Sequence, residues 1–197
     1  MACFDVLDRL VAEGNGYLRT AQVLEHGISK PTLARYVSKR RMERVAHGLY
    51  LAQDSWEDVL YQLCLANVGI VFSYETSLFL NGLMEREPEG IDVTVRVGYN
   101  ATHLRKRGIV VHQVQPAAFD MGVTELTTVF GNAVRTYDME RTMCDMVRNR
   151  ESLDVQVFRY AMREYMASDA KDLHRLMDYA KRLHVESSMR LYTEVML

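Results

Sequence analysis

The sequence lacks the features that mark several large classes of protein. No segment approaches the ~20 consecutive apolar residues that a membrane-spanning helix needs. The opening MACFDVLDRL carries acids early and lacks the basic-then-apolar layout of a signal peptide. The three cysteines, Cys3, Cys64 and Cys144, lie far apart and form no C-x-x-C pair. These absences predict a cytoplasmic protein that has reduced thiols and no membrane partner.

The sequence also lacks the residue patterns of the common catalytic and metal sites. The P-loop, G-x-S-x-G and H-E-x-x-H patterns are absent, as is the Gly-Ser turn combined with a D-x-D/E strand of a nucleotidyltransferase. Glu75 and Asp92 could offer oxygen ligands to a nuclease metal, but no Asp/Glu-x-Lys pattern completes that site. The six histidines are scattered without ligand spacing. We therefore expect no enzyme, no metal and no cofactor.

Charge is unevenly distributed along the 197 residues, although the formal net charge is only −2. Residues 1–52 hold eight Lys/Arg and five Asp/Glu, so they carry +3 and the remainder carries −5. An acidic stretch begins just after Gln53. The length suits one large or two small domains, and the hydrophobic fraction of 48% is sufficient for real cores. We place one domain at 1–52 and a second at 53–197.

Residues 20–51, TAQVLEHGISKPTLARYVSKRRMERVAHGLYL, predict two short helices followed by a hairpin. Thr20 is expected to cap the first helix, and Gly27 to end it. Ser29 is expected to open the second helix, with Pro31 in the first turn, where a missing N–H costs little. A strand, a glycine turn and a second strand complete the segment. This order is typical of a winged helix-turn-helix.

The second helix and the hairpin are strongly basic. Between residues 29 and 51 there are six Lys/Arg and a single acid, Glu43. Neutralisation of phosphates supplies much of the affinity for DNA, and the second helix of such a motif enters the major groove. The alternative is that these charges only solvate a surface helix. We expect the following residues to contact DNA: Ser29, Lys30, Thr32, Arg35, Tyr36, Lys39, Arg40, Arg41, Arg44, His47 and Gly48.

Residues 53–197 predict a mixed α/β domain that ends in a helical bundle, so the fold class is α+β. A strand is expected at 91–97, a hairpin over 126–137, and helices from Asp138 onward. Many of the twelve methionines have helical spacing there, which is more typical of an adaptable core than of a binding groove. The basic turn Arg105-Lys106-Arg107 is a candidate surface for nucleic acid or for an anionic substrate. It could equally be a solvated loop.

Four segments resemble the antitoxin of AbiE abortive-infection systems, a type IV toxin–antitoxin family. They are GYLRTAQVLEHGISKPTLARYV, RMERVAHGLYL, SYETSLFLNGLMEREP and VRTYDMERTMCDMV, which together cover most of residues 14–150. The resemblance implies a winged helix that binds inverted repeats in its own promoter and represses transcription. It also implies a second domain that counters a nucleotidyltransferase-like toxin without forming a stable complex with it. A ligand-responsive repressor with no toxin partner remains the alternative.

Overall fold

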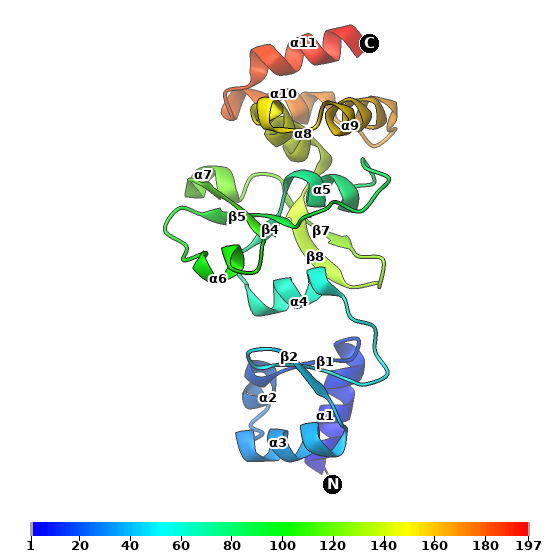
Figure 1. Ribbon diagram of the computed structural model, residues 1–197, viewed down its shortest axis with the longest axis vertical. Helices are drawn as coiled ribbons and strands as arrows, with labels where there is room; N and C mark the ends of the chain where they lie inside the picture. Colours follow the sequence, from blue (N-terminus) through cyan, green and yellow to red (C-terminus); the bar gives the residue numbers. More distant parts are fainter. Residues whose placement is uncertain (1, 197) are drawn as a thin grey trace. The chain divides into compact units, whose positions relative to one another are not determined.

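The computed structural model describes residues 2–196, which form two compact units (Figure 1). The first unit extends to Val68 and includes the loop Thr127–Ala133. The second unit comprises Gly69–Leu126 and the chain from Val134 onward. Met1 and Leu197, the outermost residues of the two expected domains, lie outside the described residues. The expected α+β class is confirmed, with a helix–turn–helix and hairpin first and a helical bundle last.

Three helices and a small sheet form most of the first unit. The helices are α1 (Ala2–Glu13), α2 (Thr20–Glu25) and α3 (Lys30–Lys39). Helices α1 and α3 bury apolar residues three or four positions apart, which lie on one face of a helix, while α2 buries Val23 alone. The core that they share consists of Leu7, Leu10, Leu18, Val23, Ile28, Leu33, Tyr36 and Met42.

The sheet of the first unit has the order β1-β3-β2 and is antiparallel. Its strands are β1 (Tyr17–Arg19), β2 (Glu43–Ala46) and β3 (Leu49–Leu51). The expected hairpin is therefore present, and Tyr17 pairs with Leu51 across the β1–β3 ladder. Gly48 has φ +68°, a conformation that glycine adopts at little cost, and it closes the turn. Below, the hairpin β2–β3 is called the wing.

The first unit is larger than the expected domain 1–52. It adds α4 (Val59–Ala66), whose Tyr61 and Leu65 pack on Tyr17 and on the apolar residues of β3. Helix α4 begins only after its N-cap Asp58, and Trp56, just before it, is 81% exposed. Because α4 packs against the sheet, the compact unit extends past the acidic stretch after Gln53 and ends at Val68.

Asp58 is a buried hydrogen-bond centre of the first unit. Its Oδ1 accepts from the backbone N–H of Tyr61 and so caps α4. Its Oδ2 accepts from Thr128 Oγ1 at 2.5 Å and from Asn132 Nδ2 at 2.8 Å. Because a buried carboxylate needs several donors, these contacts explain why the loop Thr127–Ala133 belongs to this unit.

The second unit is built on a five-stranded mixed sheet with the order β6-β5-β4-β8-β7. Strand β4 is antiparallel to β5 and parallel to β8, while β5 and β6 run parallel. The strands are β4 (Val71–Phe72), β5 (Asp92–Arg96), β6 (Val110–Val114), β7 (Val123–Thr127) and β8 (Ala133–Tyr137). The helices that connect them are α5 (Tyr74–Leu80), α6 (Thr102–Arg105) and α7 (Pro116–Phe119).

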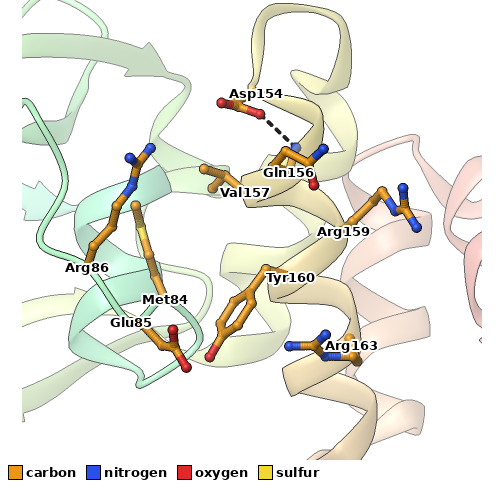
Figure 2. Close-up of a pocket in the computed structure, with 9 residues that line it drawn as sticks. All are labelled: Met84, Glu85, Arg86, Asp154, Gln156, Val157, Arg159, Tyr160 and Arg163. Atoms are coloured by element: carbon orange, nitrogen blue, oxygen red, sulfur yellow. Dashed lines mark hydrogen bonds between the residues drawn. The ribbon is translucent and has the colours of Figure 1, made fainter.

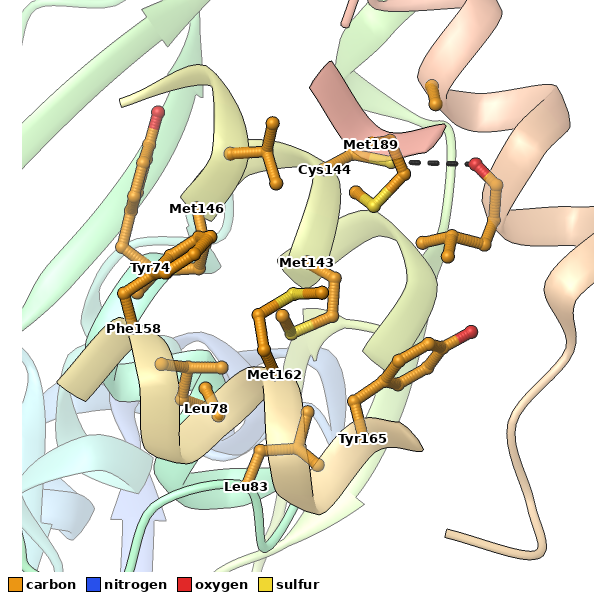
Figure 3. Close-up of a cluster of buried hydrophobic side chains, with 14 of the residues drawn as sticks. Tyr74, Leu78, Leu83, Met143, Cys144, Met146, Phe158, Met162, Tyr165 and Met189 are labelled. Atoms are coloured by element: carbon orange, nitrogen blue, oxygen red, sulfur yellow. Dashed lines mark hydrogen bonds between the residues drawn. The ribbon is translucent and has the colours of Figure 1, made fainter. Parts of the chain in front are cut away.

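The chain after β8 is helical, as expected. Helix α8 packs against both α5 and α10. The segments are α8 (Met139–Arg148), the short 3-10 helix η1 (Arg150–Ser152), α9 (Val155–Ala167), α10 (Leu173–Arg182) and α11 (Glu186–Met196). Figure 3 shows the core between them, where Met143, Met146, Met162 and Met189 are buried. The interpretation of these methionines as core residues is confirmed.

One buried ion pair lies within α8, and its arginine also ties α8 to α7 and the loop that follows α7. Arg141 is fully buried, and its Nε donates to Asp145 Oδ2 at 3.0 Å. The same guanidinium donates to the backbone oxygens of Ala118 and Met121. Burial raises the pKa of the Asp145 carboxyl, and Arg141 opposes that shift. The guanidinium therefore both pairs a buried carboxylate and satisfies loop carbonyls, as buried charges require.

Candidate nucleic-acid interface

The start of α3 is organised by its first polar residues. Ser29 is the N-cap, and its Oγ accepts from the backbone N–H of Thr32 at 3.4 Å. The Ser29 and Thr32 hydroxyls are also within hydrogen-bonding distance, at 3.0 Å. Pro31 lies in the first turn, as expected. Ser29 and Thr32 are therefore engaged with each other, although Ser29 is exposed at the surface.

The expected cap of α2 is displaced by one residue. Arg19 occupies the N-cap position without a side-chain cap, and Thr20 is the first helical residue. The backbone N–H of Thr20 instead donates to the carbonyl of Gly48 at 2.7 Å. This tertiary bond ties the start of α2 to the tip of the wing, which explains why Thr20 is not used as a cap.

Tyr36 does not face solvent, which corrects its expected place on the DNA-facing side of α3. Its side chain is in the core, with a relative exposure of 2%. The ring meets Phe4 edge-on at 5.2 Å, and the hydroxyl donates to Asp8 Oδ1 at 2.6 Å. This hydrogen bond, with a smaller contribution from Arg40, lowers the pKa of Asp8. Tyr36 therefore positions α3 on α1 and cannot reach a groove.

The C-terminal half of α3 is held against α1 by its charged residues. Arg40 donates to Asp8 Oδ2 at 2.5 Å, in a pair whose side chains are both partly exposed. Lys39 lies with its Nζ 5.4 Å from the centre of the Phe4 ring. Asp8 was not identified from the sequence, and no local pattern marks it, because its partners lie about thirty residues later. It orients the basic helix without being basic itself.

Three exposed cations in this region are unengaged. Among the residues that the structure describes, the side chains of Lys30, Arg35 and Arg41 form no ion pair or hydrogen bond. Lys30 is the first residue of α3, and Arg35 lies in the middle of the helix, two positions after buried Leu33 and therefore on the opposite side. Their charges are available to an external anion without breaking an internal contact. These residues and the wing form what we call the basic face.

Arg41 follows α3 in an unusual backbone conformation. Its φ is +51°, in the left-handed region that disfavours side chains with a Cβ atom. Its backbone N–H donates to Ser38, and the N–H of Met42 donates to Val37. These two bonds are those of a Schellman motif, whose left-handed position is usually glycine. An arginine here retains backbone strain where the chain leaves the helix and enters the wing.

The tip of the wing carries the remaining expected residues. A terminal nitrogen of Arg44 lies 3.2 Å from His47 Nδ1, and Arg44 Nε donates to the carbonyl of Ala46 at 3.4 Å. Arg44 and His47 are exposed. Gly48 closes the turn beneath them, and a Cβ there would lie 3.3 Å from Thr20 Oγ1. The glycine is thus a structural part of the wing that allows the two basic side chains to sit side by side.

The basic turn of the second unit is also exposed. Arg105 ends α6, and Lys106 and Arg107 follow it. Leu104 is fully buried and anchors the turn, while Gly108 adopts φ +77° before β6. The structure therefore gathers these three cations on a single surface turn, as the sequence suggested.

The described residues offer neither a metal site nor a membrane-spanning helix. The described residues contain no group of three or more His, Cys, Asp or Glu side chains placed to hold a metal ion. Within the same part of the chain, no helix is long and apolar enough to cross a membrane.

Comparison with known proteins supports a regulatory role for this region. Residues 5–53 match the model of a family described as "Transcriptional regulator, AbiEi antitoxin", a range that includes most of α1, all of α2 and α3, and the wing. No curated protein matches the chain. Among solved structures, the RV2827C protein from Mycobacterium tuberculosis is similar with a TM-score of 0.60 at 13% sequence identity. The match covers 89% of this chain and 70% of that one, and at this identity it supports the fold alone.

Proposed function

We propose that this protein is an antitoxin of a type IV system that represses its own promoter by binding inverted repeats. The observation that carries the proposal is the basic face with its unengaged cations Lys30, Arg35 and Arg41, which lies within the segment that matches the antitoxin regulators. Exposed, unpaired cations on a helix–turn–helix are the groups that neutralise DNA phosphates. The buried Tyr36 is excluded from this interface.

The residues of the basic face take different roles in this proposal. Lys30 begins α3 and Arg35 lies in its middle, and the N-terminal part of such a helix normally meets base edges in the major groove. Arg41, Arg44 and His47 follow on the wing side, where phosphates are the natural partners. Ser29 and Thr32 fix the start of the helix, and Lys39 and Arg40 combine contacts to α1 with solvent exposure.

Mobility shifts with promoter DNA and scrambled DNA test the DNA-binding half. Arg35→Ala is expected to weaken promoter binding by about 1–3 kcal/mol, since a bidentate contact to guanine has this value. Arg182→Ala, which removes an exposed arginine on α10, is the control and leaves binding unchanged. Equal loss on both DNAs would reassign Arg35 to a phosphate. No loss on either DNA would remove it from the interface and undermine the proposal.

Bacterial growth tests the antitoxin half. We propose that residues 1–52 carry DNA recognition and residues 53–197 carry antitoxicity, with Arg105, Lys106 and Arg107 on the surface that acts against the toxin. A Lys30→Ala/Arg35→Ala double variant of the full chain, co-expressed with the neighbouring toxin, is expected to restore growth while losing repression. A triple alanine variant at 105–107 is expected to do the reverse. If the unaltered protein does not restore growth, the antitoxin assignment fails and a repressor remains.

A further inference from the structure

The second unit contains a groove that the proposed function does not use. It has a volume of about 650 Å³ and lies between the turn Met84–Arg86 and one side of α9 (Figure 2). Pockets of several hundred Å³ are the size at which small ligands are bound. The groove lies within one unit, so its shape does not depend on the other unit.

The floor of the groove combines apolar and aromatic side chains. Met84 and Val157 line it together with Tyr160, which projects from α9 toward the turn. In Figure 2 the Tyr160 hydroxyl points toward the carboxylate of Glu85. The Arg163 guanidinium lies 4.9 Å from the centre of the Tyr160 ring. An aromatic ring with a hydrogen-bonding edge and a neighbouring guanidinium suits a planar ligand.

Arginines supply the charge at this groove. Arg86 and Arg159 are exposed and form no ion pair among the described residues. Arg163 pairs with Glu164, its neighbour on the exposed side of α9, and exposed pairs of this kind are weak. Two acids also line the groove. The Oδ1 of Asp154 caps α9 through the backbone N–H of Gln156 at 2.7 Å, and the Glu85 carboxylate faces the Tyr160 hydroxyl. The groove thus offers guanidinium groups to an anion.

We propose that this groove binds a nucleotide, with the phosphates on Arg86 at one end of the groove and the base against the Tyr160 ring, beside Arg163. Guanidinium groups match the geometry of phosphate oxygens and bind them with two hydrogen bonds. A nucleotide is the common cellular ligand that joins such an anion to a planar ring. The nucleotide is either free or the end of a single strand of RNA. This inference stands independently of the proposed repression, because it concerns other residues.

Calorimetric titration of the full chain with ATP, adenosine, tripolyphosphate and single-stranded oligoadenylate tests the proposal. ATP or oligoadenylate is expected to bind, with adenosine and tripolyphosphate each weaker by about tenfold or more, since each lacks one half of the ligand. Arg86→Ala and Tyr160→Leu are each expected to weaken binding of the same probe by about tenfold. Arg182→Ala on α10 is the control and leaves it unchanged, and Arg35→Ala on α3 reports any binding of the probe to the basic face.

The probes distinguish the two sources of the ligand. Binding of ATP that depends on Arg86 and Tyr160 identifies a free nucleotide, and equivalent binding of oligoadenylate alone identifies a strand. Absence of binding by both probes overturns the proposal. Binding that falls equally in the Arg35→Ala variant also overturns it, because the basic face would then hold the probe. Thermal melts of each variant exclude loss of fold. Arg86→Ala is expected to bind promoter DNA as the unaltered protein does, so the outcome at the groove is separate from the outcome for repression.

Discussion

Replacement of Arg41 separates the stability of the first unit from its affinity for DNA. Arg41 has φ +51° at the left-handed position of the Schellman motif that ends α3. An L-residue in this region costs roughly 1–2 kcal/mol relative to its preferred conformations. Glycine avoids that cost but loses about 0.5–1 kcal/mol more backbone entropy on folding. We therefore expect Arg41→Gly to leave stability unchanged or to raise it by up to about 1.5 kcal/mol.

The same change is expected to weaken DNA binding. The Arg41 side chain is exposed and unpaired within the described residues, so its removal loses a phosphate contact and no internal one. Loss of one phosphate contact reduces the slope of log K against log salt by about one unit. Retention of strain at a residue that binds a ligand is the pattern expected when function opposes stability.

Three variants and two assays examine this reasoning. Arg41→Gly and Arg41→Asn remove the charge and tolerate the left-handed conformation, whereas Arg41→Lys keeps both the charge and the strain. Urea denaturation reports stability, and promoter binding across a salt series reports the contact. An affinity retained by the lysine variant and lost by the other two is the expected pattern. A loss of stability above about 1 kcal/mol in Arg41→Gly would refute the strain argument, and an unchanged salt slope would refute the phosphate contact.

Three other changes are expected to have distinct effects. Arg44→Ala lowers affinity for promoter and scrambled DNA alike and reduces the salt slope by about one unit, which filter binding measures; a loss confined to promoter DNA would contradict this. Asp8→Asn weakens the hydrogen bond from Tyr36. Because the folded-state pKa of Asp8 is lowered, the ionised Asp8 carboxylate stabilises the folded protein. This stabilisation is complete above an unfolded-state pKa of about 4 and is lost as the pH falls through the folded-state pKa. Urea denaturation of the unaltered protein and of Asp8→Asn from pH 7 to pH 2 is expected to show that the difference between their free energies of unfolding shrinks only at the acid end. Gly48→Ala destabilises the protein by roughly 1 kcal/mol, since φ is +68° and Thr20 lies 3.3 Å from the added carbon; an unchanged melt would exclude strain there.

The sequence by itself determined the local elements of the basic face. Ser29 and Pro31 mark the start of α3, and Gly27 and Gly48 mark turns, because each residue type acts on the backbone within a few positions. The stripe of α1 and the helical spacing of the C-terminal methionines are equally local signals. The order of parts and the site of the basic helix and hairpin could therefore be predicted.

Tertiary structure decided which side chains remain available. Tyr36 has a polar group and lies in a basic helix, yet packing on Phe4 and the hydrogen bond to Asp8 bury it. Asp58 likewise brings the loop Thr127–Ala133 into the first unit, about seventy residues away in the chain. The groove beside Tyr160 arises from two segments that are distant in sequence. Periodicity and capping act over a few residues, whereas burial depends on which distant partner arrives, and only the folded chain specifies that partner.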